Sequence, residues 1–330
     1  MRRGAKKTTG ELGLARKLAL APYSVWAVLF IVVPLVFVAY YAFTDQHFGF
    51  TAENITRFFT DTSVSNIDIP TLLERLDTNN PFKWIARWFS LSMSEKLVLI
   101  CRVRGTNEVY TYLLIFMRSL VLAVISTVIC LLLGYPFAYM ISKASARTQS
   151  ILITIIMIPM WMNFLIRTYA WMVMLQDTGI INNFLASIGF EKGLRIIGTE
   201  RAVIIGMVYD YFPYMILPIY SVMAKMDGKL IEAARDLGCS PFGVLRRVIF
   251  PLSLPGVISG IMMVLIPSIS TFYISQKLGY GKFLLVGDVI EGQYTAGNLH
   301  FAAAIAFILM IVLLAGMAIM QRAANKRAVA

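Results

Sequence analysis

The segment Glu232–Pro255, EAARDLGCSPFGVLRRVIFPLSLP, is charged and lies between two apolar segments that are each long enough to cross a lipid bilayer. Apolar side chains recur at helical spacing around its start, which predicts a short helix with one apolar stripe made of Leu230, Ala233, Ala234 and Leu237. Gly238 is expected to end this helix. Ser240 and Pro241 are typical of an N-cap and a first helical residue, so a second helix should begin there and stop before Pro251.

The composition is that of a membrane protein. Of the 330 residues, 58% are hydrophobic and only 15% are charged. The three cysteines form no Cys-x-x-Cys pair and there are only two histidines, so we expect neither a disulfide framework nor a metal site. A net charge of +12 is explained first by basic residues gathered on the cytoplasmic face of a membrane protein, and we do not expect nucleic-acid binding.

Six apolar runs each have close to the ~20 residues that a membrane span needs. The first, Tyr23–Phe43, follows a tail with six basic residues and is longer than the core of a signal peptide, which predicts an uncleaved span. The others are Tyr112–Tyr139, Ile151–Leu175, Ala202–Met223, Gly256–Phe272 and Phe301–Met320. Lys and Arg are enriched in the tails and in the loops after the second and fourth spans, which predicts a multi-pass inner-membrane protein with both termini in the cytoplasm.

This topology divides the chain into segments with different expected environments. They are a cytoplasmic tail (1–21), a first membrane helix (22–43), an extracytoplasmic region (44–110), a membrane core (111–323) containing the cytoplasmic loop 224–255, and a cytoplasmic C-terminal tail (324–330). In the extracytoplasmic region, Trp84, Ile85, Trp88 and Phe89 follow Pro81 at helical spacing. They indicate either an amphipathic helix on the outer membrane surface or part of a small packed cap.

The spacing of Glu232-Ala233-Ala234, Gly238 and Pro251 resembles the EAA loop in the membrane subunits of ABC importers that work with a solute-binding protein. The resemblance implies an all-α membrane fold of the type I importer permease class, with six transmembrane helices and a cytoplasmic coupling helix that docks on a separate ATPase dimer. The coupling residues would be Leu230, Glu232, Ala233, Ala234, Leu237, Gly238 and Pro251. Glu232 would orient the docking, and the two alanines would let two backbones approach closely. Val248 and Phe250 stand where the family more often has Ile and Leu.

A second run, Pro159–Trp171 (PMWMNFLIRTYAW), is similar to a run in the spermidine/putrescine branch of these permeases, as are Gly134–Tyr139 and Tyr211–Pro218. The resemblance implies that polyamines are the cargo, that an extracytoplasmic polyamine-binding protein delivers them, and that a second permease subunit takes part. Lys277 departs from this branch, since many relatives carry an acidic residue there. Ferric iron or another organic amine therefore stays open as the cargo.

Three ionisable side chains, Arg118, Arg167 and Asp210, fall inside predicted spans, where charges are costly and are functional candidates. Arg167 and Asp210 are predicted at similar depths and could form a structural ion pair, or Asp210 could face the pathway and meet a cationic cargo. Aromatic faces also suit a cation with an aliphatic spine. The candidate pathway residues are Asp210, Trp161, Arg167, Tyr169, Tyr211 and Phe272. Alternatively, most of these aromatic residues belong to belts at the membrane–water interfaces.

The chain lacks the phosphate-binding motif of ATPases. Gly279-Tyr280-Gly281-Lys282 has neither the spacing of G-x-x-x-x-G-K-[ST] nor its final Ser or Thr. We therefore expect no ATP hydrolysis and no cofactor in this chain, with ATP and Mg²⁺ bound by the partner ATPase. The alternative is an ion-coupled secondary carrier, which usually has intramembrane carboxylates or broken helices on related halves, but no internal repeat is visible in the sequence.

Overall fold

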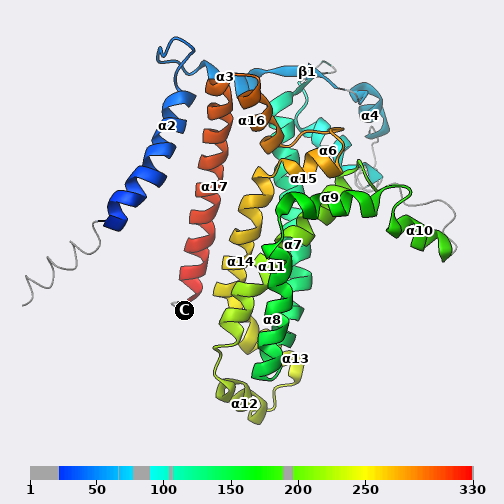
Figure 1. Cartoon of the computed structure of the whole chain (residues 1–330), viewed down its shortest axis with the longest axis vertical. Helices are drawn as coiled ribbons and strands as arrows, with labels where there is room; N and C mark the ends of the chain where they lie inside the picture. Colours follow the sequence, from blue (N-terminus) through cyan, green and yellow to red (C-terminus); the bar gives the residue numbers. More distant parts are fainter. Residues whose placement is uncertain are drawn as a thin grey trace, which may run out of the picture.

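The computed structural model describes residues 22–65, 67–76, 90–103, 106, 108–188 and 196–328. The predicted tail 1–21 and the aromatic run 84–89, predicted as helical, lie outside the described residues. Most of the described chain is helical, and the long helices stand roughly upright beside one another in Figure 1.

Among the described residues, five helices are long and apolar enough to cross a membrane. They are Pro22–Ala42, with η1 (Val28–Val32) and α2 (Val33–Ala42); α7 (Thr111–Lys143); α11 (Glu200–Met223); Pro241–Ser270, with α13 (Pro241–Val244), η2 (Leu245–Ile249) and α14 (Phe250–Ser270); and α17 (Leu299–Ala328). The first, second, fourth and sixth predicted spans each coincide with one of these helices.

The third predicted span, Ile151–Leu175, is not one continuous helix. It is divided into α8 (Ala146–Trp161) and α9 (Phe164–Leu175), and the axis of Phe164–Ser187 is bent by 91° from that of α8. Met162 is extended, and the Asn163 side chain accepts a hydrogen bond from the backbone N–H of Leu165 at 2.8 Å. Asn163 is thus an N-cap that starts a new helix, and the bent pair counts as a sixth span only if both parts are taken together. We call Met162 and Asn163 the elbow.

The core of the bundle is formed by α7, α11 and α14, with α11 packed against both of the others. Glycines bring α14 close to α11: a Cβ on Gly256 would lie 2.8 Å from the carbonyl oxygen of Pro218. A Cβ on Gly260 would lie 3.1 Å from that of Met215, whose side chain is fully buried. Small residues at these positions allow the close backbone approach that is typical of helix pairs in membranes.

The first membrane helix lies apart from this core. In Figure 1, α2 runs beside α17, and it packs mainly against that helix. Only 6% of the most apolar stretch of Pro22–Ala42 is buried. Its exposed Val, Leu and Phe side chains suit a surface that faces lipid or another subunit rather than water.

The region between the first two membrane helices is a packed cap in its described part, with its own small cores. Its elements are α3 (Glu53–Thr60), β1 (Thr62–Val64), α4 (Ile69–Leu76), α6 (Met93–Ile100) and β2 (Glu108–Tyr110). The two strands pair antiparallel, with Thr62 opposite Tyr110. Ile69, Val98 and Val109 are buried together between these elements. Two shorter helices, α15 (Tyr273–Leu278) and α16 (Val286–Thr295), lie near the same end of the bundle in Figure 1.

Candidate functional site

The predicted coupling helix is present as α12 (Gly228–Asp236). The Asp227 side chain caps its start by accepting a hydrogen bond from the backbone N–H of Lys229 at 3.0 Å. Gly238 ends it with a positive φ of 80°, as predicted. The N–H of Gly238 donates to the carbonyl of Arg235 at 2.8 Å, and that of Cys239 donates to Ala234 at 3.1 Å. These two bonds form a Schellman turn, which favours glycine at the left-handed position.

The apolar stripe predicted on α12 is divided between two faces. Ala234 packs against this chain together with Ile231, which the predicted stripe did not include. Ala233 and Glu232 are exposed, and the exposed fractions of Leu230 and Leu237 are 49% and 86%. The inward face follows the helical repeat through Ile231 and Ala234, so Ala234 is not available to a partner and Leu230, Ala233 and Leu237 are. We call these three residues and Glu232 the docking face.

The second predicted helix begins at Pro241, where the Ser240 side chain accepts from the N–H of Gly243 at 3.2 Å. It does not stop before Pro251, and this expectation was wrong. The helix widens into the π-turn η2, in which the N–H of Phe250 donates to the carbonyl of Leu245, and it then continues to Ser270. Pro251 cannot donate a backbone hydrogen bond, and the wider turn before it accommodates the proline ring. The resulting 30-residue helix is about 45 Å long.

Arg167 and Asp210 form a buried ion pair, as the sequence suggested they could. Arg167 Nη1 lies 3.3 Å from Asp210 Oδ1, and the two side chains are only 8% and 2% exposed. The Arg167 guanidinium also lies over the ring of Phe164, 5.9 Å from its centroid. Because α9 is bent away from α8 at the elbow, Arg167 meets Asp210 from a helix that runs across the bundle, and its side chain is buried.

The other candidate pathway residues differ in exposure. Trp161, Tyr169 and Phe272 have exposed fractions of 73%, 43% and 42%. Tyr211 is buried, and its hydroxyl donates to the carbonyl oxygen of Pro267 at 3.4 Å. Trp161 ends α8 at the elbow and Tyr169 lies on α9, whereas Phe272 lines a separate groove with α2, α16 and α17. Tyr211 belongs to the helix packing.

Sequence reasoning missed a contact at Tyr169. Lys277 Nζ lies 5.2 Å from the ring centroid of Tyr169 and 5.5 Å from that of Tyr273. The two tyrosines come from α9 and α15, which are far apart in the sequence but pack together. Lys277 stood out in the sequence only as a departure from the family pattern, and nothing in the sequence places it beside Tyr169.

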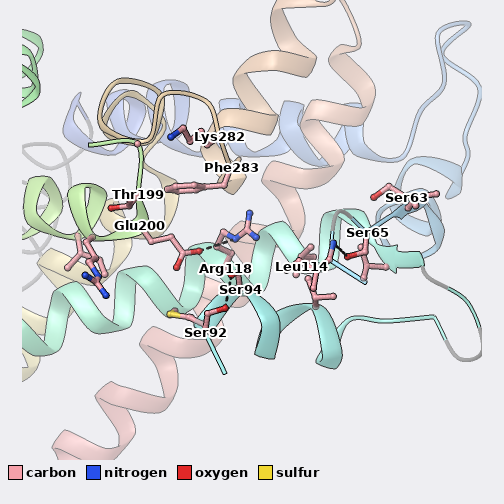
Figure 2. A pocket seen from close by; sticks show the side chains of 18 residues that line it. Ser63, Ser65, Ser92, Ser94, Leu114, Arg118, Thr199, Glu200, Lys282 and Phe283 are labelled. Carbon is pink, nitrogen blue, oxygen red and sulfur yellow. Dashed lines mark hydrogen bonds and ion pairs between the residues drawn. The ribbon is translucent and has the colours of Figure 1, made fainter. Parts of the chain in front are cut away.

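Arg118 lies at the end of α7 that is next to the packed cap, in a cavity of about 710 Å³ between the cap and the core. Figure 2 shows it pointing toward Glu200, the first residue of α11, with Arg118 Nε 3.5 Å from Glu200 Oε1. Its guanidinium also lies 5.7 Å from the ring centroid of Phe283. A carboxylate in the first turn of a helix is favoured by the helix dipole, so Arg118 has a structural explanation as the partner of Glu200.

Comparison with known proteins relates this arrangement to transport systems. Residues 131–329 match the profile of a family described as "Binding-protein-dependent transport system inner membrane component". The spermidine/putrescine transport system permease protein PotB of Haemophilus influenzae is 43% identical over 217 residues, which are 65% of this chain and 76% of that protein. PotB of Escherichia coli is 40% identical over 204 residues, 61% of this chain and 74% of that protein.

More distant relatives agree with these matches. The inner membrane ABC transporter permease protein YdcU of Escherichia coli is 27% identical over 247 residues, 71% of this chain and 78% of that protein. A crystal structure of a bacterial ABC transporter that imports the acidic polysaccharide alginate superposes with a TM-score of 0.64 over 98% of both chains, at 14% identity. The fold is therefore that of an ABC importer permease. The family profile matches more than half of this chain, so the chain belongs to the binding-protein-dependent transport system inner membrane components.

Proposed function

We propose that this chain is the permease subunit of an ATP-driven importer that carries polyamines such as spermidine and putrescine across the inner membrane. The observation that carries the proposal is the 43% identity to a PotB protein over 217 residues. A separate ATPase dimer binds ATP and Mg²⁺, a second permease subunit completes the pathway, and an extracytoplasmic polyamine-binding protein delivers the cargo. The docking face lies on the cytoplasmic side together with both chain termini.

The geometry supports a direct mechanical link between the ATPase and the pathway. α12 is attached to the chain by Ile231 and Ala234, and it exposes Leu230, Ala233 and Leu237 as well as Glu232. It packs against α13 and η2, which continue into α14 without a break. When the ATPase closes and moves α12, a continuous helix of about 45 Å transmits the movement to the core.

The cargo would pass along the open surface at the elbow. Trp161 and Tyr169 offer aromatic faces there, which attract ammonium groups and also accommodate the methylene chain of a polyamine. Asp210 is already paired with Arg167 and is almost completely buried. We therefore propose that the Arg167–Asp210 pair supports the elbow and that the aromatic surface contacts the cargo.

Reconstitution tests the proposal. The chain is placed in proteoliposomes with its ATPase, second permease and binding protein, and uptake of labelled spermidine and putrescine is measured with and without internal ATP. We expect uptake only with ATP, and none when the ATPase subunit is left out. Uptake by the chain alone would instead establish a secondary carrier, a class in which broken helices also occur. ATP-dependent uptake of ferric iron without polyamine uptake would contradict the proposed cargo.

A further inference from the structure

Two interruptions in the helices lie side by side at the elbow end of the bundle. The first is the elbow itself, and the second separates α14 from α15, where Thr271 is extended. α9 packs against α15, so the two interruptions share one surface. In Figure 1, α9 and α15 lie side by side, lower in the view than the top of α17.

This surface is open at the elbow in the part of the chain that the structure describes. Met162 at the elbow is 51% exposed, whereas Thr271 at the second interruption is buried. Non-helical backbone at membrane depth is tolerated where it is buried in protein or lines a water-filled cavity, and it is not found facing lipid. The exposed backbone at the elbow therefore faces an aqueous path or a partner subunit along that path, and the second interruption is buried in protein.

Two tyrosine rings on this surface hold a cation. The centroids of Tyr169 and Tyr273 are 6.1 Å apart, with the ring planes at 77°. Lys277 Nζ lies within 5.5 Å of both centroids, inside the ~6 Å range in which a ring face attracts an ammonium group. No described carboxylate forms an ion pair with Lys277, and its ammonium group interacts with the two tyrosine side chains, including the hydroxyl of Tyr169. We call Tyr169 and Tyr273 the tyrosine pair.

We propose that the tyrosine pair is a binding subsite for a primary ammonium group of the transported amine, and that Lys277 occupies this subsite as a tethered competitor. The identity of the cargo as a polyamine rests on the proposed function. The lysine side chain is itself a primary ammonium on four methylene groups, so it has the same chemistry as the end of an alkyl polyamine. Phe164, whose ring centroid is 6.0 Å from that of Tyr273, extends the aromatic surface for the methylene chain.

A competing lysine would keep the subsite weak. Cargo can bind only when the Lys277 ammonium leaves the rings, and Lys277 can return when the cargo moves on. Passage through a transport pathway needs sites that bind strongly enough to admit the substrate and weakly enough to release it. On this view Lys277 is a specificity-determining residue, because it lowers the affinity for ammonium groups and leaves the rings in place.

The first test measures binding of labelled spermidine to the assembled permease–ATPase complex in nanodiscs without the binding protein. We expect Lys277→Gln to bind spermidine about 2- to 10-fold more tightly than wild type, because one cation–π competitor is removed. The double variant Tyr169→Leu/Tyr273→Leu should bind more weakly, whereas Tyr169→Phe/Tyr273→Phe keeps two ring faces and should bind like wild type. Lys282→Gln removes a lysine from a nearby loop and serves as the matched control.

Chemical rescue tests whether the charge of Lys277 is responsible. In a Lys277→Cys/Cys239→Ser variant the two remaining native cysteines, Cys101 and Cys130, are buried. Labelling with 2-aminoethyl methanethiosulfonate places an ammonium at position 277 and should restore the weaker, wild-type affinity. The neutral 2-hydroxyethyl reagent should leave the affinity high.

The subsite is refuted if Lys277→Gln and the double leucine variant, both assembled normally, bind spermidine as wild type does. It is also refuted if both labels have the same effect on the cysteine variant. Failure of the proposed function has a different signature, since the complete wild-type importer would then take up no polyamine with ATP. A complex that imports polyamine normally but shows none of these affinity changes rejects the subsite alone.

Discussion

The loop that contains α12 and the region around the elbow are stabilised in different ways. At α12 the turns are set by contacts between residues close in sequence: Asp227 caps the start, Gly238 forms the Schellman turn and Ser240 caps the next helix. The elbow depends on contacts between distant segments, such as Arg167 with Asp210 and Tyr169 with Lys277. Both regions connect helices at an end of the bundle, but only the elbow holds charged groups in contact with the core and with aromatic rings.

The difference indicates what each region can do. A loop whose shape is specified locally keeps that shape when a partner binds, and it leaves the docking face free for contact. A region held by a few polar contacts between distant segments can exchange those contacts for others, as cargo binding requires. The predictions below test this division by removing one type of contact at a time.

The largest effect is expected at the buried ion pair. Asp210→Ala leaves the Arg167 guanidinium buried without its carboxylate, which should destabilise the protein by about 3–5 kcal/mol. Thermal unfolding in detergent measures the loss. The double variant Asp210→Ala/Arg167→Met removes both charges and should recover much of the stability, with transport retained if the pair is structural. A stable double variant that no longer transports would instead assign Asp210 to the cargo path.

At the coupling loop, the turn after α12 should matter for transport more than for stability. Gly238→Val forces a β-branched residue into a left-handed conformation, at a cost of roughly 1–2 kcal/mol or a distorted turn. We expect uptake in the reconstituted system to fall at least about tenfold, with normal amounts of the protein in the membrane. Gly297→Val is the matched control, because Gly297 has a φ of 84° and, like Gly238, has no described atom within 4 Å of the position that a Cβ would take. Equal loss of uptake in both variants would contradict a specific role for the α12 turn.

The two faces of α12 should respond differently to truncation. Leu237→Ala removes a side chain that is 86% exposed and should leave the stability of this chain within about 0.5 kcal/mol of wild type. Its affinity for the ATPase should fall about three- to tenfold, as loss of a buried apolar contact in the complex predicts. Ile231→Ala, on the inward face, should do the reverse and lower stability first. Unfolding and ATPase-binding measurements on both variants distinguish the faces, and identical behaviour would contradict the assignment of the docking face.

The same division explains how much could be predicted from the sequence. Apolar length predicted the spans, and local cap and glycine signals predicted where α12 ends and where the next helix begins. The sequence did not show which face of α12 packs inward, because Ile231 and Leu230 are both apolar and only the position of the core distinguishes them. The prediction that the second helix stops before Pro251 was also wrong, because a π-turn can accommodate a proline that would otherwise end a helix.

At the elbow, prediction was weaker for a physical reason. Hydrophobicity continues through Met162, so the apolar run predicts one span, although Asn163 is a usable N-cap signal inside it. The ion pair of Arg167 could be suggested because both partners fall in apolar runs, where an unpaired charge is costly. The contact of Lys277 with the tyrosine pair depends on how α15 packs on α9, and no local pattern encodes such packing.

A pH-dependent effect on stability is expected beside α15, at Asp288. Its carboxylate accepts hydrogen bonds from the N–H of Leu285 at 2.8 Å and from the Ser275 hydroxyl at 2.9 Å, yet burial raises its pKa to about 6. The pKa in the unfolded chain is about 3.9, so the folded state binds the proton more tightly. Protonated Asp288 therefore stabilises the folded state. This contribution is complete below the pKa of the unfolded chain, and it is lost as the pH rises through 6.

Asp288→Asn removes this titration, so wild type should lose about 2 kcal/mol of stability relative to the variant between pH 4 and pH 7. Thermal unfolding of both proteins across this range measures the difference. If Asp288→Asn and wild type keep a constant difference in stability across this range, the buried carboxylate does not titrate there. Ser275, which lies on the short helix α15 together with Lys277, would then donate its hydrogen bond to a carboxylate that stays charged. That bond would anchor α15 more firmly than is assumed in the proposal that Lys277 leaves the tyrosine pair when cargo binds.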